Sequence, residues 1–270
     1  MKYCVVLRVC ETVDAVNQLS RPWGLNKLET ILLTLRSLVA SLKAAEIEYG
    51  IYVVEDGISE ALRAELEKWS EEIISTDERG VCGSLSKSYE VARHFSDGDW
   101  VYFCEDDYLH REVCMQYIDE LLRGATEYLQ AYDRELLFIH PCDYPDRYNR
   151  PDRFTGRSDD RYAIFRSGRC HWREVPSATY TWLMRAEVLR RHAALFRDNI
   201  DHHARFGTGD QYWGEVVFQR EDALCISPLP SLSTHLHEGV MSPLVNWQAC
   251  LLYTSPSPRD ATLSRMPSSA

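Results

Sequence analysis

Short apolar runs alternate with amphipathic segments through the first hundred residues, and this alternation constrains the fold more than any other feature. The runs are rich in β-branched and aromatic residues, as buried strands are, and they cover Tyr3 to Val9, Tyr49 to Val54, Ile73 with Ile74, and Trp100 to Cys104. Between them, apolar residues recur at three- and four-residue spacing, which is typical of helices that cover a sheet. The pattern predicts an α/β fold with a mostly parallel, doubly wound central sheet flanked by helices.

Local signals place the ends of the expected helices. Asn26 and Ser59 can each cap a helix, and a third helix through Leu85 and Ala92 follows the glycine-interrupted loop Arg79 to Ser84. The second half is more elaborate. A long loop covers Asp143 to Asp160, Arg161 to Val175 with a turn at Ser167-Gly168 predicts a β-hairpin, and a strand (Thr179 to Met184) and a helix (Ala186 to Phe196) follow.

One domain accounts for this order, with a nucleotide-binding half at 1–110 and an acceptor half at 111–249. Residues 250–270 are rich in Ser and Pro and predict a disordered tail. The stretch Tyr253 to Asp260 also resembles translated sequencing-adapter sequence, which would make this tail non-native.

Composition excludes several classes of protein. The chain has 30 Lys and Arg against 41 Asp and Glu, and a net charge of −11 argues against binding nucleic acid, which needs a basic surface. No apolar run is long enough to span a membrane or to act as a signal peptide, so we expect a cytoplasmic protein, with peripheral membrane contact left open. The nine cysteines are scattered without a C-x-x-C pair, which indicates neither a disulfide framework nor a zinc ribbon.

Acidic residues follow two of the expected strands. Asp56 comes after the second strand, and the triplet Glu105-Asp106-Asp107 comes directly after the strand that begins at Trp100. In a doubly wound sheet these strand ends meet at one edge, where ligands bind at the switch point of the strand order. Alternate carboxylates such as Glu105 and Asp107 can face the same way and supply oxygen ligands for Mg²⁺ or Mn²⁺. A solvated acidic loop is the competing interpretation.

The order of these features resembles the GT-A-fold glycosyltransferases, and most closely the family-2 type. The similarity lies in the first strand, in Val53-Val54-Glu55-Asp56-Gly57, in the segment Arg79 to Ala92 and, most specifically, in Asp97 to Asp107, which is similar to the family's D-x-D-type motif. Glutamate stands at positions 55 and 105, where the family more often has aspartate. The resemblance implies transfer of a sugar from a nucleoside-diphosphate sugar to a glycan or another hydroxyl acceptor.

Roles for individual residues follow from the resemblance. It implies that Asp107, with Glu105 and the late histidine His235 of Pro230-Ser231-Leu232-Ser233-Thr234-His235, holds Mn²⁺ or Mg²⁺. It implies nucleotide-sugar contacts for Asp56, Arg79, Gly83, Glu105 and Asp106. Asp210, in Gly207-Thr208-Gly209-Asp210, matches the segment that supplies the general base, which would make the reaction inverting; a helix cap is the competing role of Asp210. A retaining outcome stays open, because no sequence spacing fixes where the acceptor lies.

Other residues carry weaker signals. His235 and His237 share a face if their segment is extended, but His237 has no counterpart in the resemblance. His202 and His203 are expected to be solvated loop residues, although with His235 and His237 they form the one conceivable zinc cluster. Aromatic residues that could line an acceptor groove, and arginines that could attract an anionic acceptor or the diphosphate, lie between the triplet and Asp210: Tyr144, Tyr148, Phe154, Tyr162, Trp172, Tyr180, Trp182, Arg147, Arg150, Arg153 and Arg157. Core packing is the default for Trp182, and a solvated loop explains the arginines equally well.

Two rival functions stay open on the sequence alone. A sugar nucleotidyltransferase would also place acids at a strand end, but it usually has a glycine-rich basic loop after the first strand, and the segment Arg8 to Thr12 contains no glycine. A catalytically silent protein that binds nucleotides or sugars on the same scaffold is the other. Pyrophosphate release from a nucleoside triphosphate and a sugar 1-phosphate would identify the first, and donor binding without turnover the second.

Overall fold

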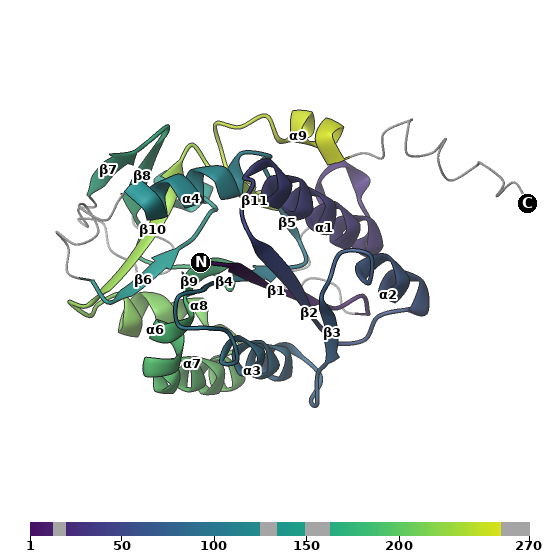
Figure 1. Ribbon diagram of the computed structural model, residues 1–270, viewed down its shortest axis with the longest axis horizontal. Coiled ribbons are helices and arrows are strands. Elements are labelled where there is room, and N and C mark those ends of the chain that lie inside the picture. The colour runs from purple at the N-terminus through teal and green to yellow at the C-terminus, as the bar shows by residue number, and fades with distance from the viewer. Residues whose placement is uncertain (13–19, 125–133, 149–162, 255–270) are drawn as a thin grey trace, which may run out of the picture.

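A nine-stranded sheet forms the centre of the computed structural model, which describes residues 1–12, 20–124, 134–148 and 163–254 (Figure 1). The strand order is β3-β2-β1-β4-β9-β6-β10-β8-β7. The strands are β1 (Tyr3–Val9), β2 (Tyr49–Glu55), β3 (Glu72–Ser75), β4 (Trp100–Glu105), β6 (Leu136–Ile139), β7 (Ile164–Ser167), β8 (Cys170–Glu174), β9 (Trp182–Arg185) and β10 (Ala223–Leu229). Strands β8 and β9 run against their neighbours and the others run one way, so the predicted, mostly parallel α/β sheet is confirmed.

Helices cover both faces of this sheet. One face carries α1 (Lys27–Ala44), α2 (Glu60–Leu66) and α4 (Cys114–Gly124), and the other carries α3 (Val81–Ala92), α6 (Ala186–Arg191) and α7 (Ala193–Phe206) (Figure 1). The remaining helical segments are η1 (Pro22–Gly24), η2 (Pro145–Tyr148), α8 (Asp210–Tyr212), the π-helical η3 (Trp213–Val217) and α9 (Trp247–Thr254). No helix in the described ranges is long and apolar enough to cross a bilayer.

The two-residue period of the strands divides the core into two layers. In β1, Tyr3, Val5 and Leu7 face the α1 layer while Val6 faces the α3 layer, and β4 divides in the same way between Tyr102 and Phe103. Because both faces of these strands are buried, their sequences contain few polar residues. This explains why the strand signal in the sequence was an unbroken apolar run.

The local signals for element ends largely agree with the structure. Asn26 caps α1 in a capping box with Glu29, Ser59 caps α2, and strands β7 and β8 form the predicted hairpin. The helix α3 begins at Val81, inside the stretch that we predicted as a loop, because Gly80 with a φ of 93° ends the preceding turn earlier. The helix predicted for Ala186 to Phe196 is divided into α6 and α7 at His192, whose φ is −104° and ψ 26°.

Two further differences concern the end of the chain and a small second sheet. The helix α9 extends to Thr254, so the beginning of the predicted tail is helical, and the rest of the tail lies outside the described residues. The sequence did not indicate strands β5 (Tyr108–His110) and β11 (Ser233–His235). They pair antiparallel, with Tyr108 opposite His235, and β5 packs beside α1. This pairing positions the residues described next.

Candidate functional site

The acids predicted at the strand ends share one edge of the sheet. β1 lies between β2 and β4 and runs parallel to both, so residues 55–57, 10–12 and 105–107 leave the sheet side by side. The backbone N–H of Asp56 donates to the carbonyl of Val9 at 2.9 Å, and that of Cys10 donates to Oδ2 of Asp106 at 2.9 Å. The strand order runs from β3 through β2 to β1 and then continues with β4, so it reverses direction at β1. A ligand is expected at this switch point.

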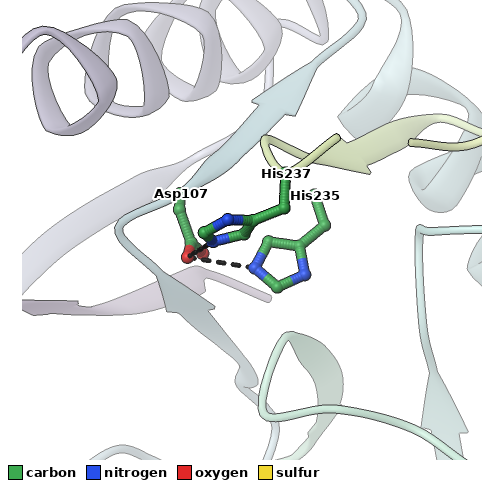
Figure 2. Close-up of side chains that lie close together, drawn as sticks. All are labelled: Asp107, His235 and His237. Carbon is green, nitrogen blue, oxygen red and sulfur yellow. Dashed lines mark hydrogen bonds and ion pairs between the residues drawn. The ribbon is translucent and has the colours of Figure 1, made fainter. Parts of the chain in front are cut away.

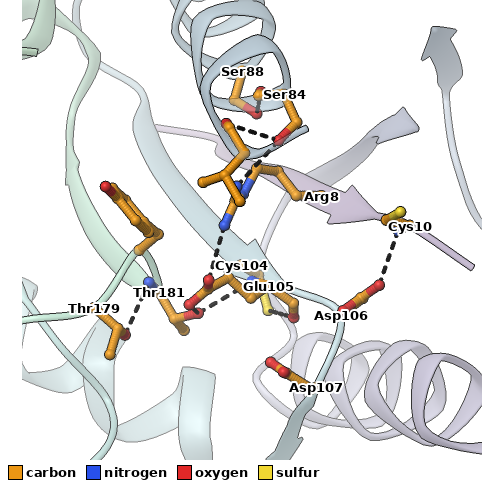
Figure 3. Close-up of polar contacts among 12 residues, drawn as sticks. Arg8, Cys10, Ser84, Ser88, Cys104, Glu105, Asp106, Asp107, Thr179 and Thr181 are labelled. Atoms are coloured by element: carbon orange, nitrogen blue, oxygen red, sulfur yellow. Dashed lines mark hydrogen bonds and ion pairs between the residues drawn. The ribbon is translucent and has the colours of Figure 1, made fainter. Parts of the chain in front are cut away.

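The first two acids of the triplet are held by basic side chains. Nη2 of Arg8 lies 2.8 Å from Oε1 of Glu105, and the hydroxyl of Thr181 reaches the other oxygen of Glu105 at 3.4 Å (Figure 3). Nζ of Lys27 lies 2.7 Å from Oδ1 of Asp106, whose other oxygen accepts from Cys10. Asp106 therefore ties α1 to the end of β1, and each oxygen of these two carboxylates already has a partner.

The third acid has a different environment. Oδ2 of Asp107 lies 3.0 Å from Nε2 of His235 and 3.1 Å from Nε2 of His237 (Figure 2). Its Oδ1 is buried and has no hydrogen-bond partner within the described ranges of the chain. Although burial opposes ionisation, the charge of His235 and the hydrogen bonds from both histidines hold the pKa of Asp107 well below its ordinary value. Asp107 is therefore a carboxylate with one oxygen still available.

The register of β5 with β11 brings these side chains together. The backbone N–H of Leu236 donates to the carbonyl of Asp107 at 2.7 Å, so the residues on either side of Leu236 face the aspartate. The ring of His235 stacks on Tyr108 with centroids 4.9 Å apart, and the hydroxyl of Tyr144 lies 3.2 Å from its Nδ1. These contacts fix the ring of His235 with Nε2 toward Asp107.

Asp107, His235 and His237 offer three ligand atoms that all lie within 4.8 Å of one another. A carboxylate and two imidazoles suit a divalent transition metal, because imidazole binds such ions far better than it binds Mg²⁺. The orphaned Oδ1 of Asp107 fits the same interpretation. The predicted ligands Asp107 and His235 are thus brought together, whereas Glu105 lies outside this cluster.

The family resemblance assigned no role to His237, which the sequence placed only in the conceivable four-histidine zinc cluster. The signal was present in the alternating spacing of His235 and His237, which places both on one face of an extended segment. His202 and His203 lie on helix α7 rather than in a loop, with His202 bonded to the carbonyl of Thr208 and His203 to the hydroxyl of Tyr180. In the part of the chain that the structure describes, neither joins the cluster, so the four-histidine zinc hypothesis is wrong.

Asp210 is the first residue of α8, and Gly209 occupies the cap position. The helix start is confirmed, but Asp210 is not its cap. Burial and, to a smaller extent, the negative charge of Glu105 raise the pKa of Asp210 to about 7, although the charges of His235 and Arg147 oppose the shift. These charges place Asp210 within electrostatic reach of the histidine and acid cluster, with a pKa suited to accepting a proton near neutral pH.

The predicted nucleotide contacts lie where β2 ends. Oδ2 of Asp56 accepts from the backbone N–H of Gly80 at 2.6 Å, which ties this strand end to the start of α3. Arg79 is exposed beside the turn at Gly57. Glu55 is used internally, since it pairs with Arg63 at 2.9 Å and accepts from the backbone of Gly57. Arg79 is therefore exposed near this strand end, whereas Asp56 is buried and bonded to the backbone of Gly80.

Gly83 has a packing role that the sequence did not suggest. A Cβ at this position would lie 1.9 Å from the carbonyl oxygen of Glu78 and 2.6 Å from its carbon. Only glycine allows α3 to approach this backbone so closely. The structure accounts for Gly83 without a ligand.

Gly83→Ala is expected to destabilise the fold by about 1–3 kcal/mol, because backbone atoms cannot move aside. Helix propensity alone would favour alanine by about 1 kcal/mol, so a loss must come from the contact with Glu78. Urea unfolding of Gly83→Ala and of Gly124→Ala, whose Cβ would meet nothing within 4 Å, measures the difference. Equal stability of the two variants would contradict the packing role.

Apart from Tyr148 and Arg147, the aromatic and arginine candidates divide into three groups. Trp182 and Trp172 are fully buried, so the core role expected of Trp182 is confirmed. Tyr144 contacts the histidine cluster, and the ring of Tyr180 lies 5.2 Å beneath the guanidinium of Arg8. The third group, Phe154, Tyr162, Arg150, Arg153 and Arg157, lies outside the described residues.

No protein-family model and no curated protein matches the chain. Among solved structures it is similar to S. aureus TarS 1–349, at 16% identity and a TM-score of 0.40, covering 72% of this chain and 49% of that one. It is also similar to the galactosyltransferase LgtC in complex with donor and acceptor sugar analogues, at 12% identity and a TM-score of 0.46, covering 98% of both. A nucleotidyl transferase from Methanothermobacter matches at 13% identity and a TM-score of 0.41, covering 84% and 86%.

The chain spans about half the length of that TarS fragment and 35% of a longer TarS structure. At such identities and TM-scores, the function has to be inferred from the residues of the site.

Proposed function

We propose that this protein is a metal-dependent glycosyltransferase that moves a sugar from a nucleoside-diphosphate sugar to a hydroxyl acceptor. The observation that carries the proposal is the cluster of Asp107, His235 and His237 at the carboxyl end of β4, within electrostatic reach of Asp210. A metal ligand set beside a base of suitable pKa is what direct displacement at an anomeric carbon requires.

The metal would be held by Asp107, His235 and His237, and the two imidazoles favour Mn²⁺ over Mg²⁺. Such an ion supplies positive charge for the diphosphate as it departs. An imidazole nitrogen binds a metal ion only when it carries no proton, so ion binding would replace the contacts that both Nε2 atoms make with Oδ2 of Asp107. Arg8 and Thr181 keep Glu105 outside the ligand set and beside Asp210.

Asp210 would remove the proton from the acceptor hydroxyl while that oxygen attacks the anomeric carbon. Because the base and the attacking oxygen act on one side and the diphosphate leaves on the other, the configuration inverts. Asp56 and Arg79, at the end of β2, would contact the base or ribose of the donor.

A thermal-shift screen of nucleoside diphosphates with Mn²⁺, with Mg²⁺ and with no metal tests the proposal. At about 100 times the dissociation constant a ligand stabilises the folded state by about 2.7 kcal/mol, which raises the melting temperature by about 5 °C or more. We expect at least one diphosphate to do so with Mn²⁺ and not without metal. Asp107→Asn and His237→Gln should each abolish the shift.

His202→Gln is the matched control, because His202 is a histidine outside the cluster. It should leave the metal-dependent shift intact. A shift that survives in Asp107→Asn would show that the ion binds elsewhere, and the absence of any diphosphate response would remove support for a transferase.

A further inference from the structure

Arg147 has hydrogen-bonding groups that the protein itself does not use. It lies in η2, where its backbone N–H donates to the carbonyl of Tyr144 at 3.2 Å and its Nη2 donates to the carbonyl of Ser177 at 2.5 Å. Its Nε and Nη1 are buried and have no hydrogen-bond partner among the residues that the structure describes. A guanidinium always carries its charge and has no acceptor, so these N–H groups need an oxygen acceptor, which the described residues do not supply.

The neighbouring carboxylate, Asp143, forms its ion pair with another arginine, although the charge of Arg147 also acts on it and opposes the rise of its pKa. Asp143 is fully buried, its Oδ1 lies 2.5 Å from Nη2 of Arg173, and its Oδ2 accepts from the hydroxyl of Tyr148. The ring of Tyr148 in turn lies 4.9 Å from the guanidinium of Arg173. Within the ranges that the structure describes, no carboxylate forms an ion pair with Arg147.

Burial of a charged group with unpaired donors is unfavourable, and buried charges are normally paired. The arrangement around Arg147 is therefore one that an added anion would complete. In a solvated loop the guanidinium of Arg147 would be exposed to water. Its Nε and Nη1 atoms are buried instead.

Contacts on both sides connect Arg147 to the acceptor side of the proposed site. Tyr144, to which its backbone is bonded, contacts Nδ1 of His235 at 3.2 Å. Ser177, to which its side chain is bonded, begins the segment in which Thr179 bonds Tyr108 and Thr181 bonds Glu105. The charge of Arg147 also lowers the pKa of Asp210, so the two side chains lie within electrostatic reach of each other.

We infer that Arg147 binds a carboxylate or phosphate group of the acceptor, so that the acceptor is an anionic sugar or another hydroxyl compound that carries an acid group. The inference rests on the proposed function in one respect: Asp210, as the base, marks where the acceptor hydroxyl lies. A charge-assisted contact at Arg147 would then fix the distance from the acid group of the acceptor to the reacting oxygen.

The side-chain Nε–H resonance of Arg147 reports on this site directly. In ¹⁵N-labelled, metal-free protein, the resonance is assigned by its loss in Arg147→Lys and followed while glucuronate, glucose 6-phosphate or glucose is added. We expect it to shift with at least one of the two anionic sugars and to stay unchanged with glucose. Arg147→Gln should weaken binding of that sugar at least tenfold, while Arg197→Gln, which changes an exposed arginine on α7, should not.

Thermal melts identify any variant that fails to fold, and Arg147→Lys, which keeps the charge, should bind with intermediate affinity. An unchanged resonance with both anionic sugars, or equal binding by Arg147→Gln, would overturn the inference. A shift caused by a nucleoside diphosphate or inorganic phosphate but by neither sugar would assign the anion to the donor and overturn the acceptor assignment. The proposed function has a separate test, because it would be contradicted if no nucleoside diphosphate caused a Mn²⁺-dependent thermal shift.

Discussion

Asp210→Asn is expected to lower the rate of sugar transfer by about 10²–10⁴-fold and, at the same time, to stabilise the folded protein at neutral pH. The carboxamide keeps the size and shape of the side chain but cannot accept a proton from an acceptor hydroxyl. It also removes a charge that burial and the neighbouring Glu105 disfavour, which is why the pKa of Asp210 is raised to about 7. Activity and stability should therefore change in opposite directions.

The pH dependence follows from the same raised pKa. Between the ordinary value of 3.8 and about 7, the folded protein holds a proton on Asp210 that the unfolded chain has released, so the stability from this group falls as pH rises through that range. The transfer rate should do the reverse and rise with pH to a plateau above about 7, because the base works only when deprotonated. In Asp210→Asn the part of the stability profile that belongs to Asp210 should be flat.

Melting temperatures and transfer rates at several pH values, with Asp198→Asn as control, test these expectations. Asp198 is an exposed acid on α7, so the same chemical change there should alter neither quantity appreciably. A variant at position 210 that keeps transfer within a few-fold of the wild-type rate would exclude Asp210 as the base.

The sequence predicted those parts of the fold and site that depend on neighbouring residues. The strand that begins at Trp100 can be predicted from its apolar run alone. The caps at Asn26 and Ser59 can be predicted from the residues of the first helical turn that follows each. Asp107 could be singled out because the acidic triplet directly follows a strand. These signals are local, so no knowledge of the tertiary contacts was required.

The rest depends on contacts between distant residues. His237 is 130 residues from Asp107, and only the register of β11 on β5 brings the two together. In the same way, Glu105 is paired because Arg8, which is 97 residues away in the sequence, lies beside it in the fold. Gly83 was interpreted as a ligand residue because its close contact with the backbone of Glu78 leaves no trace in composition or periodicity.

Gly209→Ala is expected to reduce transfer by about 100-fold or more and to destabilise the fold by about 1–3 kcal/mol. A Cβ at Gly209 would lie 1.7 Å from Oη of Tyr180 and 2.8 Å from Nδ2 of Asn199. Neither side chain can move freely, because Tyr180 bonds His203 at 3.1 Å and the buried Asn199 donates to the carbonyl of Gly209 at 3.0 Å. The backbone at Gly209 must therefore shift, and it carries Asp210 with it.

Two comparisons separate this displacement from a general loss of stability. Gly98→Ala adds the same methyl group in a turn where no atom lies within 4 Å, so it should leave both the melting temperature and the transfer rate near wild type. Adding Tyr180→Phe to Gly209→Ala removes the closest contact, that with Oη, while the ring carbon at 2.6 Å remains, so we expect partial recovery of the rate. Such recovery would identify Tyr180 as a residue that positions the proposed base. Wild-type rate and stability in Gly209→Ala would show that the position of Asp210 does not depend on this contact.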